Sequence, residues 1–335
     1  MASTATVTIP QAMEAIANDP SQFISRLVAP VVRPETIGTD VSGTQFKGTF
    51  FRTDWQGMSV AGRSLQKAPG SDIKQLNVGL SDQTITIPLR EGQTTISVAL
   101  RDRMDAKGIQ SYEGQIAAPA LTSAIMLEHE QRLASLVSTG SNWGGSTSGA
   151  ANGYWDDPSY DAVQAIAKAC AQPLKFGKKA NKIVLGWAAF FALKQNPYFK
   201  ALAGDIQTGF TPAKASELIS ELISMNLGPS ADKVEVLILS AAQNTSELGQ
   251  AASQSFINSN FAWFGHVPPQ DDASLYVRSA LYTFEAQPFA LREDILPTRN
   301  EYAYTAYQAA QVTVVEPALG FCFESPVQSP TNYGG

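Results

Sequence analysis

The sequence is short of the residues that carry redox and metal chemistry. It holds two cysteines, Cys170 and Cys322, and two histidines, His129 and His266, all far apart in the chain. A disulfide framework is therefore not indicated, and we expect reduced thiols in a cytoplasmic setting. Residues this scattered do not have the spacing of metal ligands, so we assign no metal and no cofactor.

Charge is scarce as well. Asp, Glu, Lys and Arg make up 16% of the 335 residues, whereas roughly 25% is usual in a soluble protein. Much of the surface must therefore consist of Ser, Thr, Asn, Gln and small apolar residues. Such a surface suits a protein that buries its exterior against copies of itself. A globular protein with a neutral surface would have the same composition, so both interpretations stay open.

Clustered positive charge and long apolar runs are also missing. The net charge is −6, whereas a protein that neutralises many phosphates needs clustered Lys and Arg. The longest apolar candidate, residues 183–193, falls well short of the roughly 20 residues of a membrane span. Residues 1–19 lack the charged and apolar regions of a signal peptide. We therefore expect no membrane contact, and only weak, non-specific contact with nucleic acid.

One long amphipathic helix is predicted over residues 117–140. Its apolar face recurs at three- and four-residue steps and consists of Leu121, Ile125, His129, Leu133, Leu136 and Val137. Pro119 is tolerated in the first turn, and Gly140 is expected to cap the end. Three charged residues fall off this stripe and are expected to face water: Glu128, Glu130 and Arg132. Because β-rich segments flank the helix, we interpret it as a spine on which a sheet packs.

An N-terminal arm precedes this region. Residues 10–24 have the pattern of a short helix, and residues 27–34 look extended because residues before proline avoid the α region. Neither segment has enough apolar residues to fold alone. We therefore expect the arm to lie over another element.

A two-faced β-hairpin is predicted over residues 76–101. In residues 84–89 and 95–100, apolar side chains alternate with Thr and Ser, which is typical of half-buried strands. Glu91 and Gly92 would form the turn between them. Because an isolated hairpin is only marginally stable in water, we expect it to pack on a neighbouring subunit. The alternative is that this segment belongs to a larger internal sheet.

The composition changes after the long helix. Residues 140–153 are rich in Gly, Ser and Asn and are predicted to form a loop. From about residue 158 to residue 290 helical and strand patterns alternate, which predicts a mixed α/β domain. The expected helices are 159–171, 187–194 and one starting at 211, and the expected strands are 182–185 and 234–239. Strands return at 275–284, 309–316 and 320–324, and the last two are expected to rejoin the sheet under the spine.

Nucleophile and phosphate-binding motifs are not found. Residues 145–149 carry Thr147 where the G-x-S-x-G motif needs serine. Residues 204–209 have the glycine spacing of a phosphate-binding loop, but Lys-Ser/Thr does not follow and Asp205 would repel phosphate. We therefore reject a nucleotide site at this position.

The titratable residues favour structural roles. His129 lies on the apolar stripe, so we expect a packed, hydrogen-bonded histidine, and His266 is expected at a strand end. The adjacent acids at 156–157 and 271–272 lie in proline-containing loops, where turn chemistry explains them better than acid–base catalysis. We assign no catalytic, cofactor-binding or metal-binding residue and predict that the chain is not an enzyme.

The order of these elements resembles that of the major capsid proteins of tailed bacteriophages. The spine over 120–140 leads into a second domain, which opens with Trp155, Asp157 and Asp161. The strand and helix over 182–193, the break at Asn196–Pro197 and the late strand over 260–267 are similar as well. The resemblance covers nearly the whole chain and depends on element order rather than on one signature motif.

The resemblance implies an α+β, HK97-like capsid fold. Its expected parts are an N-terminal arm (1–45), a peripheral domain (46–157) with an extended β-hairpin loop (70–103) and a spine helix (118–139) on a β-sheet, a mixed α/β axial domain (158–300), and a return to the peripheral domain (301–335).

The function implied is that of a major capsid protein in the virion. It would assemble in the host cytoplasm into pentamers and hexamers of an icosahedral head around double-stranded DNA. The implied partners are further copies of the chain, a separate scaffolding protein, a portal and a decoration protein. Two alternatives stay open: an encapsulin-type nanocompartment shell, which shares this fold, and an enzyme built on the α/β domain.

Overall fold

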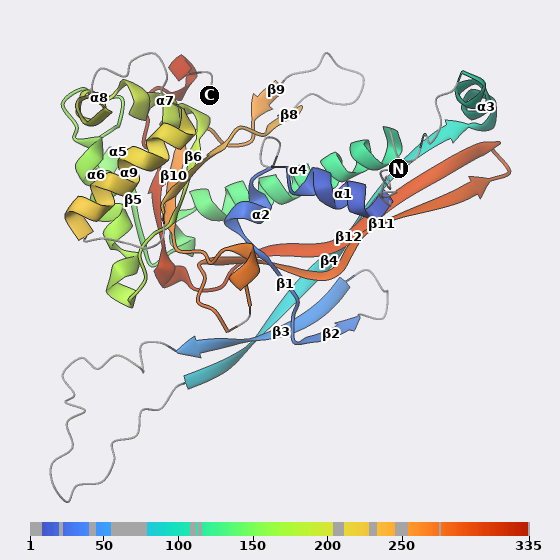
Figure 1. The fold of residues 1–335 in the computed structure, drawn as a ribbon, viewed down its shortest axis with the longest axis horizontal. Helices are drawn as coiled ribbons and strands as arrows, with labels where there is room; N and C mark the ends of the chain where they lie inside the picture. Colours follow the sequence, from blue (N-terminus) through green and yellow to red (C-terminus); the bar gives the residue numbers. More distant parts are fainter. Residues whose placement is uncertain are drawn as a thin grey trace, which may run out of the picture.

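The computed structural model describes residues 9–19, 23–39, 45–54, 79–107, 112, 116–203, 211–227, 233–244, 254–274 and 276–333. They form an elongated α+β fold with two main sheets (Figure 1). Helix α4 (Ala118–Ser138) runs along the long axis and contacts strands of both sheets. The long helix predicted over residues 117–140 is therefore confirmed, with Pro119 in its first turn.

The larger sheet has six strands in the order β1-β11-β12-β4-β3-β2. Their bounds are β1 (Val31–Val32), β2 (Thr36–Thr39), β3 (Gln45–Asp54), β4 (Gly79–Ser97), β11 (Leu281–Leu296) and β12 (Glu301–Val314). Neighbouring strands are antiparallel except for the parallel pair β1 and β11. Segments from both ends of the chain therefore meet in this sheet.

The smaller sheet has five strands in the order β5-β13-β10-β6-β7. Their bounds are β5 (Gly145–Ser148), β6 (Lys182–Gly186), β7 (Glu235–Leu239), β10 (Phe261–Gly265) and β13 (Gly320–Glu324). Helices lie around it (Figure 1): α5 (Gly149–Asn152), α6 (Ala162–Ala171), α7 (Trp187–Gln195), α8 (Pro197–Ala203) and α9 (Pro212–Leu227). A short pair, β8 (Ala242–Asn244) and β9 (Gln254–Phe256), lies apart. The helices and strands predicted between residues 159 and 239 are confirmed by α6, β6, α7, α9 and β7.

Helix α4 joins two hydrophobic clusters. Leu121, Ile125 and Met126 pack with Met13 of the arm and with Tyr304 of β12. Further along the helix, Leu133, Ala134, Leu136 and Val137 belong to a second cluster that includes residues of β10 and β13. The predicted spine is therefore confirmed, but it spans both sheets rather than lying on one.

The N-terminal arm lies on α4, as predicted. It comprises α1 (Ile9–Ala17) and α2 (Ser25–Val28) before β1, and Met13 and Ala17 of α1 are fully buried. The stretch predicted as extended over 27–34 is so only in part, because α2 continues to Val28.

Strand β4 contradicts the predicted hairpin. It runs unbroken through Gly92, with residues 79–88 paired to β3 and residues 89–97 paired to β12. A Cβ on Gly92 would come within 3.3 Å of Leu121 on α4, so this glycine permits close packing of the helix and is not part of a turn. The alternative, a strand within a larger internal sheet, is confirmed. The predicted strand over 95–100 ends at residue 97, where α3 (Val98–Ala106) begins.

The loop predicted over residues 140–153 is structured. Residues 145–148 form β5, which pairs in parallel with β13, and α5 follows. A Cβ on Gly145 would lie 2.9 Å from the ring of Phe321, so a glycine is needed for this close approach. Gly140 is not the C-terminal cap of the helix as predicted, because Thr139 occupies that position. Gly140 opens a 3-10 turn, and its N–H donates to Oε1 of Glu324 at 2.5 Å.

The two last strands separate instead of rejoining one sheet. β12 enters the larger sheet under α4, as predicted, but β13 lies between β5 and β10 in the smaller one. Phe321 and Phe323 face the cluster that contains α6, while Cys322 faces the cluster that contains α4. An apolar strand buried on both faces fits the centre of either sheet, which is why its pattern did not distinguish them.

Two asparagines fasten loops to the smaller sheet. The amide of Asn181 donates to the carbonyl of Val267 at 2.8 Å and accepts from its N–H at 2.9 Å. Asn260 makes the same reciprocal pair with Val327, at 2.8 and 2.9 Å. Each side chain acts as a peptide group would in a β-ladder, so the segments after β10 and β13 are held without further strands.

We predict that Leu133→Ala destabilises the protein. The side chain is fully buried between α4 and the smaller sheet, and such truncations cost about 2–5 kcal/mol. Urea unfolding of the purified protein measures the loss. Arg132→Ala, on the exposed face one residue earlier, is the control, and equal losses in the two variants would contradict the burial of this face.

We also predict that Asn181→Asp weakens the fold. A carboxylate can still accept from the N–H of Val267, but it cannot donate to the carbonyl, so two acceptors face each other in a buried site. We expect a loss of about 2–3 kcal/mol in urea unfolding. The exposed Asn332→Asp serves as the control, and a stability of Asn181→Asp equal to it would rule out the reciprocal pair.

Candidate functional site

Both histidines are structural, as predicted. His129 is 3% exposed, and its Nε2 lies 3.1 Å from Oε1 of Gln308 on β12. Burial, followed by the nearby positive charge of Arg90, lowers the pKa of His129 to about 3, so its ring is neutral at ordinary pH. His266 directly follows β10, and its Nδ1 donates to the backbone carbonyl of Lys179 at 2.9 Å. Neither ring is placed to act as a base on a substrate.

The cysteines are buried in the fold, and the acids at 156–157 bond within it. Cys170 and Cys322 are buried free thiols, and burial raises the pKa of both. Asp157 accepts from the N–H and hydroxyl of Ser159, both at 2.8 Å, which confirms a turn role and lowers the pKa of its carboxyl. Asp156 accepts from two N–H groups of the C-terminal segment.

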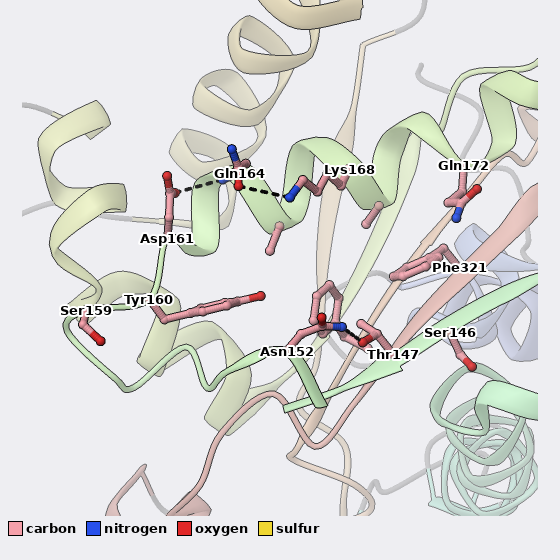
Figure 2. Close-up of a pocket in the computed structure, with 13 residues that line it drawn as sticks. Ser146, Thr147, Asn152, Ser159, Tyr160, Asp161, Gln164, Lys168, Gln172 and Phe321 are labelled. Atoms are coloured by element: carbon pink, nitrogen blue, oxygen red, sulfur yellow. Dashed lines mark hydrogen bonds between the residues drawn. The ribbon is translucent and has the colours of Figure 1, made fainter. Parts of the chain in front are cut away.

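The smaller sheet carries a pocket of about 550 Å³ (Figure 2). Phe321 and Phe323 of β13 contribute apolar lining, α6 forms one wall, and β5 with α5 forms the other. Asp161 caps α6 by accepting from the N–H of Gln164 at 2.9 Å, and Lys168 donates to the side chain of Gln164 at 3.1 Å. The charged lining residues thus bond within α6. The pocket offers a contact surface with polar walls rather than a catalytic constellation.

A second groove, of about 760 Å³, follows α9 and β7. β7 is an edge strand of the smaller sheet, and unpaired edges invite pairing with other chains. Ser216 and Ser220 of α9 accept from the N–H groups of Val236 and Val234, at 2.8 and 3.1 Å. These hydroxyls therefore satisfy two backbone N–H groups along β7 and the residue before it. The glycine motif over residues 204–209, rejected above as a phosphate-binding loop, lies outside the described residues.

The larger sheet presents open edges. β2 forms one edge, and all four of its residues are exposed. Beside it, Tyr276 is 76% exposed, and its hydroxyl donates to Glu35 at 2.9 Å. Toward the end of β11, Ile295 is 64% exposed, and α3, whose Arg101 pairs with Glu293 of β11, carries the exposed Leu100. Exposed strand edges together with apolar side chains are typical of surfaces that meet other chains.

A chain of polar contacts joins the arm to the larger sheet and α4. Arg26 of α2 pairs with Glu14 of α1 and lies 3.4 Å from Glu285 of β11. Gln308 donates to Glu285 at 2.8 Å, so its carbonyl oxygen is left to accept from His129. The histidine must therefore carry its proton on Nε2. Each side chain in this series forms a hydrogen bond or ion pair with the next, and buried polar groups require such partners.

Arg90 makes a second junction between β4, β12 and α4. Its Nε donates to Glu128 at 2.8 Å, its Nη2 donates to Gln311 at 2.9 Å, and its Nη1 donates to the carbonyl of Ala310. The planar guanidinium thus fixes the register of three elements at one point. Glu128 faces solvent as predicted, although it is paired.

Glu130 contradicts its predicted exposure. It is 1% exposed, and its Oε1 accepts from the N–H groups of Ile24 and Ser25, at 2.8 and 2.6 Å. The prediction failed because it considered one stripe, whereas the arm covers a second row of α4. The sequence does carry a signal for this row, since residues at four-residue steps are otherwise small or apolar: Ala118, Thr122, Met126 and Ala134.

Within the described ranges, no three His, Cys, Asp or Glu side chains come together in a way that could hold a metal ion. Nor is any helix there long and apolar enough to cross a membrane. The polar groups that are buried serve the junctions between elements, and the open surfaces are edges and grooves. The arrangement is thus suited to contact between chains.

No family model matches the chain, and a search of curated proteins finds no match. Solved structures do match it. A phage-related protein from Bordetella bronchiseptica is 14% identical with a TM-score of 0.66, over 97% of this chain and 99% of its own. A virus-like particle from Pyrococcus furiosus is 12% identical with a TM-score of 0.50, over 94% and 97%. The capsid of the cyanophage P-SCSP1u is 12% identical with a TM-score of 0.48, over 88% and 85%.

The first two likenesses confirm the α+β fold expected from the element order. They extend over nearly the whole of each chain, so the arm, both sheets and the helices belong to one shared architecture. At these identities the likeness establishes the fold, and function needs further argument.

We predict that His129 makes stability fall in mild acid. The pKa of His129 is about 3 in the folded state and 6.5 in the unfolded state. As pH falls below 6.5, the unfolded chain therefore binds a proton that the folded chain does not, and the free energy of unfolding decreases. His129→Gln retains an N–H donor for Gln308 without titrating. Between pH 7.5 and 4.5 the wild type should lose about 3 kcal/mol more than the variant in urea unfolding. A constant difference between the two proteins would contradict the neutral, buried ring.

Proposed function

We propose that this chain is the major capsid protein of a tailed bacteriophage, which self-assembles into the icosahedral head around double-stranded DNA. The observation that carries the proposal is the whole-chain fold likeness to a phage-related protein and to a virus-like particle. Because the likeness covers 97% and 94% of this chain, it is not due to one common domain. The element order of the sequence supports the same assignment.

The physical properties of the surface support an assembly role. The exposed edge β2 and the exposed apolar side chains Ile295 and Leu100 lie on separate elements of an elongated subunit, so contacts with neighbours can be made at more than one surface. Charged residues make up 16% of the sequence, which limits repulsion between closely packed copies. Arg26, Glu285, Gln308 and His129 bond to one another between elements of the fold, which is typical of a structural role.

The proposed parts follow the HK97-like plan. The arm (1–45) corresponds to α1 and α2 together with β1 and β2. The peripheral domain (46–157 with 301–335) corresponds mainly to α4 and the larger sheet, although its β5 and β13 pair in the smaller sheet. The axial domain (158–300) corresponds mainly to the smaller sheet with its helices, although its β11 pairs in the larger sheet. The extended loop needs a new position because β4 is continuous. We place it at the antiparallel pair β3 and β4, whose connection over 55–78 lies outside the described residues.

The finer proposal concerns assembly and partners. Pentamers and hexamers would build the shell in the host cytoplasm, with the axial domains meeting at their centres. A separate scaffolding protein, a portal and a decoration protein are the expected partners. The net charge of −6 fits an inner wall that contacts packaged DNA weakly and non-specifically.

An encapsulin-type nanocompartment shell is the second candidate. The likeness to a virus-like particle favours it, because that particle is a protein shell of similar fold. The two candidates differ in their contents, since one encloses DNA and the other encloses protein cargo.

We predict that the recombinant protein forms closed shells, or rings of five or six subunits, in negative-stain electron microscopy. The expected result follows from the shared fold and the open edges. Raising the protein concentration should shift free subunits toward assemblies by mass action. The measurement is the fraction of particles in rings or shells across a concentration series.

The outcome that contradicts the proposal is a field of monomers at every concentration, including after addition of a candidate scaffolding protein. Shells purified from a native source then separate the two candidates. Nuclease-protected double-stranded DNA supports the phage capsid, whereas a co-purified enzyme inside an empty shell supports the nanocompartment.

A further inference from the structure

The N-terminal arm is held on α4 by one carboxylate. Glu130 lies at the middle of the helix under the start of α2, and Oε1 accepts two N–H groups, from Ile24 and Ser25. These are free N–H groups at the first turn of a helix, which side-chain oxygens commonly cap. Because the capping oxygen belongs to α4 rather than to α2, these hydrogen bonds attach the arm to α4.

Beyond these two N–H groups and the nearby hydroxyl of Ser25, the carboxylate has little to stabilise its charge. Oε2 is buried without a hydrogen-bond partner. A buried carboxylate with this few partners is costly in its ionised form and much less so when protonated. The hydrogen bonds from Ile24 and Ser25 survive protonation, because Oε1 can remain the carbonyl oxygen.

The charged groups around the joint are engaged elsewhere. From the arm, Arg26 pairs with Glu14 and reaches Glu285 of β11. From the larger sheet, Arg90 pairs with Glu128. On α4 itself His129 is neutral, and beyond the helix end Glu324 of β13 accepts from Gly140. Among these groups, Glu285 resembles Glu130 in that burial raises the pKa of its carboxyl.

We propose that Glu130 is a protonation-controlled latch: the neutral carboxyl holds the arm on α4, and its ionisation weakens that docking. This regulation of the arm goes beyond the proposed capsid function and does not depend on it, because the latch lies within one subunit.

The direction of the effect follows from the pKa. Burial raises the pKa of Glu130 from 4.5 to about 7. An undocked arm would leave the carboxyl in water with its ordinary pKa. Docking is therefore favoured fully below pH 4.5, and this contribution is lost as pH rises through 7. Between pH 5.5 and 8.5, the docking equilibrium should weaken about 30-fold.

Hydrogen exchange of the full-length subunit tests the latch. Protection of the amides over residues 23–28, corrected for intrinsic exchange and normalised to residues 133–137 in the core, is measured at pH 5.5 and 8.5. We expect the wild type to lose about 30-fold protection at the higher pH. Glu130→Gln keeps an acceptor but cannot ionise, so its protection should change by less than about threefold.

Three control variants make the outcome decisive. Glu128→Gln removes a neighbouring carboxylate on the exposed face of α4 and should retain the wild-type pH response. Glu130→Ala lacks the acceptor and should leave the arm weakly protected at both pH values. Glu285→Gln removes the other buried carboxyl that faces the arm through Arg26.

A wild-type arm whose protection does not change with pH would overturn the proposal. So would a pH response that persists in Glu130→Gln, or one that Glu285→Gln alone abolishes. Each of these results leaves the capsid proposal intact, because shell formation is read by microscopy and arm docking by exchange.

Discussion

The burial of α4 on two sides constrains the rest of this structure. At 1.5 Å per residue, its 21 residues extend about 31 Å, enough to reach from the core shared with the larger sheet to the core shared with the smaller one. The same helix lies beneath the N-terminal arm. Polar side chains on a helix buried in this way cannot be left to water, so His129 and Glu130 must find partners in the elements that cover them. The helix thereby fixes the positions of β12 and α2.

The periodicity of apolar residues was sufficient to predict an element and its buried side wherever that element buries a single face. The long helix, the alternation of β6 and α7, and the packed state of His129 all follow from spacing. It failed where two partners cover one element. Glu130 looked solvent-facing because a single stripe was assumed, whereas the arm buries an adjacent row. The covering segment lies more than 100 residues away in sequence, as the contact separation of 106 residues shows, so no local pattern identifies it.

Glycine caused the other errors, for a related reason. Gly92 and the glycines after residue 140 indicate turns when only the local chain is considered. In the structure, Gly92 admits the side chain of Leu121, and Gly145 admits the ring of Phe321. A missing side chain serves a close approach as well as a turn, and only the tertiary partner distinguishes the two. The continuous β4 then pairs with β3 in one half and with β12 in the other. A strand that changes partners along its length cannot be recognised from its alternation alone.

The distribution of polar groups connects the fold with its proposed use. Arg26, Glu285, Gln308 and His129 form one path from arm to helix, and Arg90 joins two strands to the same helix. Such junctions fix the elements relative to one another, because any displacement of one element would break several hydrogen bonds at once. Glu130 differs, since one of its oxygens is buried without a partner. In the proposed shell, a subunit would occupy non-identical positions. It would then need rigid packing within each sheet and weaker docking of any segment that changes conformation. The arm meets α4 at a carboxylate with one buried, unpartnered oxygen, and the proposed latch would supply such weaker docking there.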